Sequence, residues 1–277
     1  MKVLWTVAVN TLREASRKRV LLAALLFGIA FLILFAIGLT AVVADLKKHK
    51  APIVEQRLVL TFITMAGLYA VNFLVVMTAT FMPVDTLSGE IASGVMQTVA
   101  SKPLHRAQIV IGKWAAFALV ILAYLALMAG GTVVVGRLVT GFSPPGIPQG
   151  LPLMALESMV LLSLSIAGGT RLSTIANGVT VFGMYGIAFL GGWFEQIGTL
   201  LENGAARYIG TIASLLMPSE SMWQRAAYLM QPPIMRDLHL SPFSPASLPS
   251  EAMVLWAAGY VLAALGFAVW SFGRRPL

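Results

Sequence analysis

The stretch VLLAALLFGIAFLILFAIGLTAVV, residues Val20–Val43, contains no charged side chain and is long enough to cross a bilayer as one helix. A hydrocarbon core requires about 20 consecutive apolar residues of an α-helix. The composition of the whole chain agrees, since 58% of its 277 residues are hydrophobic and only 11% are charged. Soluble proteins carry about 25% charged residues. We therefore expect a polytopic membrane protein in which lipid is the main solvent.

Five more apolar runs of similar character follow, and we expect each to form a membrane-spanning helix. They extend over Leu58–Met82, Trp114–Val135, Leu153–Gly169, Asn177–Trp193 and Ala252–Phe272. The predicted fold class is all-α, with six transmembrane helices in a single domain that covers residues 1–277.

Residues 1–19 differ in pattern from the first span that follows them. Apolar side chains form a stripe in the first half, whereas Arg13, Arg17, Lys18 and Arg19 collect toward the end. This pattern predicts an interfacial amphipathic helix. A secretory signal peptide fits poorly, because its apolar core would be shorter than the run found here.

The distribution of basic residues favours a cytoplasmic location for both termini. The basic residues beside the first span carry the most weight under the positive-inside rule, although Lys47, Lys48 and Lys50 on its other side argue against this orientation. The net charge of +8 fits contact with membrane lipid, because Lys and Arg gather at the ends of apolar runs. We expect no nucleic-acid partner.

The segment 195–251 is the one large region predicted to lie outside the membrane. Its prolines repeatedly interrupt helix formation, yet Ala206–Leu216 and Ser221–Met230 have the pattern of short helices. We expect a partly ordered extracytoplasmic cap between spans 5 and 6, on which an accessory partner could bind.

The sequence offers little material for catalysis or for cofactor and metal binding. All three histidines lie in predicted loops, no cysteine is present, and the methionines are scattered among apolar runs. A phosphate-binding loop would need Gly-x-x-x-x-Gly-Lys-Ser/Thr, but Gly112-Lys113 is followed by Trp114. We expect no enzyme activity, no metal and no cofactor in this chain. If ATP drives it, another subunit hydrolyses the ATP.

Polar residues at membrane depth are costly and are therefore candidates for function. Glu157 follows Pro152 closely, which favours a position near the outer interface, wetted or paired with Arg137, over that of a buried substrate-binding carboxylate. Asn72 and Asn177 are expected to form hydrogen bonds between helices.

The polar stretch DTLSGEIASGVMQTVASKPLHR, residues 85–106, interrupts the apolar pattern between spans 2 and 3. Ser88 is suited to cap a helix with Glu90 in its first turn, and Lys102-Pro103 would end that helix about four turns later. Gly89 and Gly94 would permit close approach of another backbone. The features favour a docking helix on the cytoplasmic side, although an ordinary solvated helix has the same local pattern.

Three groups of residues in this region resemble the pattern of ABC-2-type transporter permeases. They are GEIASG at 89–94, SKPLHR at 101–106 and IGK at 111–113. The segment from Thr11 to Arg19 is also similar to the connecting helix of that family, and the branch that it resembles most is that of permeases for multi-copper enzyme maturation.

The resemblance implies a permease subunit in the inner (cytoplasmic) membrane that pairs with a second copy or a relative, is driven by cytoplasmic ABC ATPase subunits and exports its substrate. The implied ATPase-coupling residues are Gly89, Glu90, Gly94, Lys102, Pro103, Arg106, Gly112 and Lys113. The alternatives from the residues alone are an ATP-independent scaffold or assembly factor that uses the 195–251 cap, and an intramembrane enzyme built around Glu157.

Overall fold

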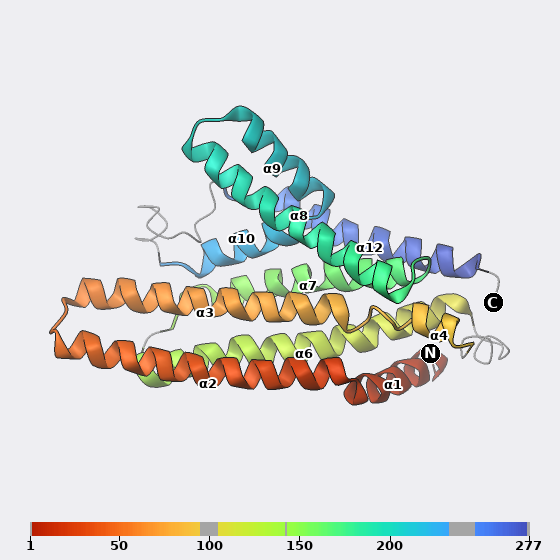
Figure 1. The fold of residues 1–277 in the computed structure, drawn as a ribbon, viewed down its shortest axis with the longest axis horizontal. Coiled ribbons are helices and arrows are strands. Elements are labelled where there is room, and N and C mark those ends of the chain that lie inside the picture. Colours follow the sequence, from red (N-terminus) through yellow and green to blue (C-terminus); the bar gives the residue numbers. More distant parts are fainter. Residues whose placement is uncertain (1, 95–104, 142, 233–246, 276–277) are drawn as a thin grey trace.

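The computed structural model describes residues 2–94, 105–141, 143–232 and 247–275, in which the regular structure is entirely helical (Figure 1). The helices are α1 (Lys2–Arg17), α2 (Arg19–Lys48), α3 (Ile53–Phe81), α4 (Ser88–Ala92), α6 (Arg106–Thr140), α7 (Ile147–Gly169), α8 (Thr174–Leu200), α9 (Gly204–Leu216), α10 (Ser219–Met230) and α12 (Glu251–Gly273). The all-α fold class is confirmed.

Six of the helices in the described residues are long and apolar enough to cross a membrane, namely α2, α3, α6, α7, α8 and α12. Each contains one of the six predicted spans almost entirely, and the protein is a multi-pass membrane protein. The helices extend beyond the apolar runs, because backbone hydrogen bonding continues into polar flanks. Helix α6, for example, begins at Arg106 and ends before Gly141, whose φ of 69° places it in the left-handed region that favours glycine at a helix end.

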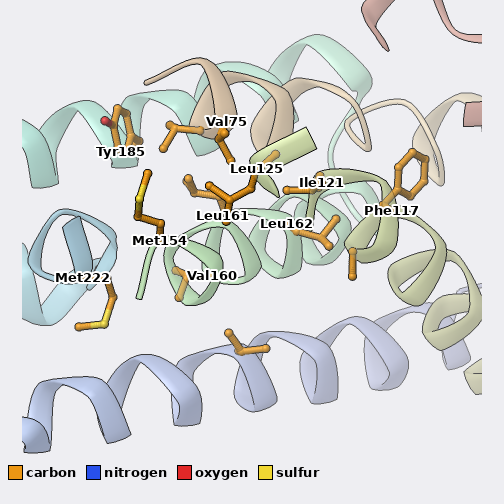
Figure 2. Close-up of a cluster of buried hydrophobic side chains, with 14 of the residues drawn as sticks. Val75, Phe117, Ile121, Leu125, Met154, Val160, Leu161, Leu162, Tyr185 and Met222 are labelled. Carbon is orange, nitrogen blue, oxygen red and sulfur yellow. The ribbon is translucent and has the colours of Figure 1, made fainter. Parts of the chain in front are cut away.

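Helix α7 lies at the centre of the bundle and α2 at its edge. In the most apolar 18-residue stretch of α7, 67% of the residues are buried within the chain, compared with 11% in the corresponding stretch of α2. The core around α7 is filled by aliphatic, methionine and aromatic side chains, including Val75, Ile121, Leu125 and Leu161 (Figure 2). The exposed apolar side chains of α2 require a lipid environment or another protein chain.

Helix α1 is amphipathic, as predicted, and the chain bends at Lys18, whose extended backbone (φ −70°, ψ 133°) separates α1 from α2. Its face with Thr11 and Ala15 is buried, whereas Arg13 and Arg17 are exposed. This buried face packs against α6. Helix α1, helix α4 and the C-terminal end of α12 lie at the same end of the bundle (Figure 1).

Helices α9 and α10 are the two short helices predicted between spans 5 and 6, and both pack against the sides of spans. Helix α9 returns along α8, where small residues allow close contact. Helix α10 packs along α7, and the centre of its Trp223 ring lies 5.4 Å from the centre of the Tyr69 ring of α3. Helix α8 contains the predicted fifth span and continues beyond its end at Trp193, as far as Leu200. The helix crosses Glu195 because backbone hydrogen bonding does not require an apolar side chain.

Candidate functional site

The segment between α3 and α6 begins with a compact turn, and helix α4 is much shorter than predicted. Instead of four turns, α4 ends at Ala92, and Gly94 follows with a φ of 75°. A glycine in the left-handed region ends a helix readily because it has no Cβ. Lys102 and Pro103, which were predicted to end the helix, lie outside the described residues.

Ser88 does not cap α4, contrary to the prediction. It is the first helical residue, and its hydroxyl donates a hydrogen bond to the Val84 carbonyl (3.0 Å) and lies 2.9 Å from the Thr174 hydroxyl. The preceding residue, Leu87, already has a helix-like backbone, so the extended geometry of a capping residue is absent. Ser88 therefore joins this segment to the start of α8.

Glu90 and Lys113 form an ion pair that connects α4 to α6. The Nζ atom of Lys113 lies 2.5 Å from Oε1 of Glu90, and only 7% and 20% of the two side chains are exposed. Both residues were predicted to belong to the coupling region, but their pairing was not predicted. A separation of 23 positions across a loop has no periodic signal that could have revealed it.

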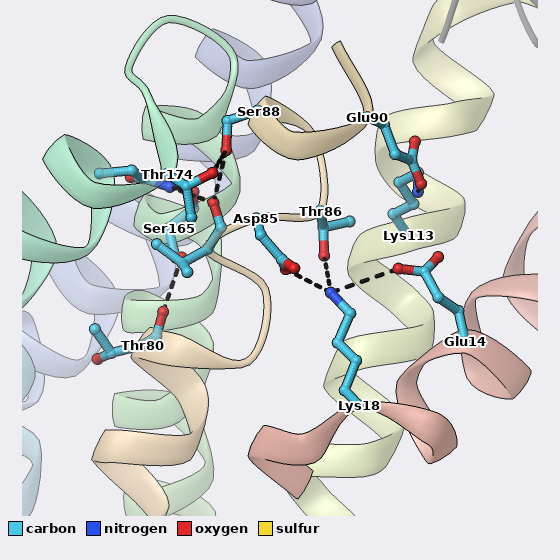
Figure 3. A network of polar contacts seen from close by, with 12 residues as sticks. Glu14, Lys18, Thr80, Asp85, Thr86, Ser88, Glu90, Lys113, Ser165 and Thr174 are labelled. Carbon is cyan, nitrogen blue, oxygen red and sulfur yellow. Dashed lines mark hydrogen bonds and ion pairs between the residues drawn. The ribbon is translucent and has the colours of Figure 1, made fainter. Parts of the chain in front are cut away.

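Lys18 forms a second connection, from the break between α1 and α2 to the same segment (Figure 3). Its Nζ atom lies 2.5 Å from Asp85 Oδ1, 3.2 Å from the Thr86 hydroxyl and 3.5 Å from Glu14 Oε1. The ammonium group also lies 5.4 Å from the centre of the Phe117 ring on α6. The sequence pattern indicated only that Lys18 is one of several basic residues near the membrane surface.

Asn177 connects helices as predicted. Its side-chain amide donates to the Val84 carbonyl (3.2 Å) and to the Ser165 carbonyl of α7 (2.8 Å). The residue is fully buried. Asn177 thus holds α7, α8 and the segment after α3 together at one point.

Arg106 contacts the C-terminal end of α12 within the chain. Its Nη1 atom donates to the carbonyls of Phe272, Gly273 and Arg275, at 3.3, 3.2 and 2.7 Å. The last carbonyls of a helix carry the negative end of its dipole, so a guanidinium group beside Phe272 and Gly273 is favourable.

The three glycines of the predicted coupling set occupy different settings. A Cβ on Gly89 would meet Asp85 at an ordinary distance of 3.6 Å, so the contacts within this chain do not require glycine there. Gly94 is required by its positive φ, and Gly112 is buried in α6.

Glu157 has a different environment from the one predicted. It is 0% exposed, and its Oε1 atom accepts a hydrogen bond of 3.3 Å from Asn72 Nδ2 of α3, whereas Arg137 is exposed. The prediction of a wetted or Arg137-paired carboxylate was wrong. Helix α7 begins at Ile147, ten positions before Glu157, so Glu157 lies well inside the helix, and α10 packs against α7 and covers it. The hydrogen bond between helices predicted for Asn72 is confirmed.

Comparison with known proteins adds no assignment: no family model matches this chain, and no curated protein sequence matches it. Functional inference therefore depends on the residues and contacts described above.

Proposed function

We propose that this chain is the membrane subunit of an ABC-2-type transporter, driven by a separate ATPase subunit that docks at the end of the bundle carrying α1 and α4. The proposal rests on the sequence pattern of residues 89–113 and on one structural observation. Two ion pairs hold the described segment after α3. Lys113 connects it to α6, and Lys18 connects it to the junction of α1 and α2.

These attachments suit a segment that transmits force. A load applied to α4 would pass through the buried Glu90–Lys113 pair to α6 and through Asp85–Lys18 to α1 and α2, so several helices would move together. An ordinary solvated loop needs no such attachments, and surface ion pairs add little to stability. The buried position of Lys113 is the observation that best supports a mechanical role.

The same contacts change the roles proposed for individual residues. Glu90 is paired with Lys113 inside this chain and so orients the docking segment, whereas Arg106 joins the start of α6 to the end of α12; neither is assigned to direct contact with the ATPase. The surface left for the ATPase is formed by the exposed face of α1, with Arg13 and Arg17, together with the exposed Asp85 and Ser93. Its mixed charge suits a polar docking surface.

A second permease copy or a relative would complete the transport path. The edge helix α2 exposes large apolar side chains such as Phe27 and Leu34 along its length, which supports a lateral partner in the membrane as well as lipid contact. Export across the cytoplasmic membrane, with both termini inside, is part of the proposal and follows from the family resemblance and from the basic residues beside the first span.

The test is affinity purification of the tagged protein from its native host in mild detergent, with ATP hydrolysis assayed on the eluate. We expect an ATPase to co-purify in a fixed ratio. In Glu90→Lys, which places two cations together, we expect the ATPase to be lost or its activity to become insensitive to the membrane subunit.

The charge-swapped double variant, Glu90→Lys with Lys113→Glu, separates a positioning role from a direct contact. The swap restores the ion pair and should recover ATPase association if Glu90 acts by holding α4 on α6. If wild-type protein purifies without any ATPase, the transporter proposal is wrong and an ATP-independent scaffold becomes the better explanation.

A further inference from the structure

Two carboxyl groups lie buried where α3, α7, α8 and α10 meet. Neither belongs to the docking segment between α3 and α6. Glu157 comes from α7 and Glu220 from α10, and they are close enough for their charges to interact. Tyr69 of α3 and Tyr185 of α8 share the electrostatic environment of both. Met154, Tyr185 and Met222, from α7, α8 and α10, belong to the surrounding apolar core (Figure 2).

No cation compensates these carboxyl groups among the described residues. Glu157 is 0% and Glu220 6% exposed, and neither takes part in an ion pair there. Arg225, on the same helix as Glu220, contacts the Pro249 carbonyl (2.5 Å) and Glu251 (3.7 Å) instead. The basic residues of the other helices packed on α7 also lie elsewhere: Arg57 and Arg137 are exposed, Arg106 and Lys113 bind other groups, and Arg274, just after α12, lies over the Trp270 ring.

A second observation concerns one oxygen of Glu157. Oε1 accepts the hydrogen bond from Asn72, but Oε2 is buried without any hydrogen-bond partner. A carboxylate oxygen in that position loses its hydration and gains nothing in return, and two neighbouring carboxylates in an apolar setting repel one another. A proton relieves both costs, because it neutralises one group and turns an oxygen into a donor.

We propose that Glu157 and Glu220 form a site that binds one exchangeable proton inside the helical bundle and that the bound proton holds α10 against α7. When the proton leaves, the two negative charges favour separation of α10 from α7 and entry of water. The site does not involve α4, so this proposal stands or falls separately from ATPase docking.

The properties of Glu220 fit this role. Burial raises the pKa of Glu220 to about 8, against a smaller opposite effect of its hydrogen bond with Gln224. Exchange would therefore occur close to neutral pH, where a small change in pH alters the occupancy of the site. Gly192 of α8 leaves room for the Glu220 side chain, since an added Cβ would lie 3.1 Å from the Glu220 Cγ atom.

The first measurement is infrared difference spectroscopy of the purified full-length protein across a pH titration. We expect a C=O stretching band of a neutral carboxylic acid at neutral pH that disappears at alkaline pH. The band should be lost or shifted in Glu157→Gln and in Glu220→Gln, and it should persist in Glu55→Gln, in which an exposed carboxyl group is replaced. Absence of the band from wild-type protein at neutral pH would overturn the proposal, whether or not the variants fold.

A second measurement detects the movement of α10. The chain contains no cysteine, so a single cysteine at Ala226, which is fully buried on α10, can report its exposure through labelling by a water-soluble thiol reagent. We expect labelling to accelerate at alkaline pH beyond the ordinary increase in thiolate, and this extra increase to vanish in Glu220→Gln. The same extra increase in Glu220→Gln would contradict the proposal, as would protection by Na⁺ or K⁺ at constant pH, which would identify a metal-cation site.

Discussion

Lys113 of α6 lies 2.5 Å from Glu90 of α4, in a setting where 7% of the lysine side chain and 20% of the glutamate side chain reach the surface. A buried pair contributes little net stability compared with two apolar side chains, but removing one partner leaves an unpaired charge. The pair therefore specifies where α4 lies on α6 more than it stabilises the fold.

Replacing Lys113 by Met should destabilise the protein by about 3 kcal/mol, because Glu90 then stays partly buried without its cation. The measurement is thermal or denaturant unfolding in detergent. The double variant Lys113→Met, Glu90→Met should recover most of the loss, whereas Lys47→Met, at an exposed position, should have little effect. A double variant as unstable as Lys113→Met would show that the pairing is not the cause.

Lys18→Met should release α1 from the segment after α3, since it removes the contacts with Asp85, Thr86 and Glu14. A cysteine at Thr11, which is buried on α1, reports this release through its labelling rate. We expect the labelling rate to increase roughly tenfold for each 1.4 kcal/mol of free energy lost from the docking of α1. Arg17→Met, one position earlier and exposed, is the matched control and should leave the rate unchanged.

Gly168→Ala should weaken the junction of α7 and α8, because an added Cβ would lie 2.1 Å from Asn177 Oδ1. The asparagine would have to move and give up its bonds to Val84 and Ser165, at a cost of about 2 kcal/mol. The melting temperature should fall accordingly. In an Asn177→Ala background the same glycine substitution should cost much less, and an equal cost in both backgrounds would contradict this account.

Gly191→Ala should separate α8 from α9, because an added Cβ would approach that of Ala213 to 2.3 Å. Gly183 and Gly186 lie on the same helix with no neighbour within 4 Å of an added Cβ. Alanine at either position should be neutral or stabilise by about 0.5–1 kcal/mol through helix propensity. Comparing the three unfolding curves tests whether close contact, and not glycine content, determines the effect.

The stability of the protein should fall as pH rises through the neutral range. Burial raises the pKa of Glu220 from 4.5 to about 8, so between these values the folded state binds more protons than the unfolded state. The contribution of this group is therefore fully present below pH 4.5 and is lost as the pH approaches 8, by up to about 1.4 kcal/mol per pH unit. Unfolding of wild-type protein and Glu220→Gln at several pH values should show a steeper slope in the wild type, because the variant retains only one of the two buried carboxyl groups, that of Glu157.

The helical spans and the general location of the polar segment could be predicted because they depend on local composition. An uninterrupted apolar run such as Val20–Val43 has few structural options in a bilayer, and the same reasoning recovered α9 and α10 from their patterns. The end of α4 at Ala92 was missed because Gly94 was considered only as a site of close approach, although its positive φ also ends a helix.

A bundle of membrane-spanning helices with an amphipathic N-terminal helix is predictable from the residues alone, because hydrophobicity and helical periodicity act over short distances along the chain. Which polar side chains meet follows from the packing of the helices. Lys113 with Glu90, Lys18 with Asp85 and Asn72 with Glu157 are 23, 67 and 85 positions apart. Their pairing depends on how helices pack in three dimensions, and no local pattern in the sequence specifies that packing.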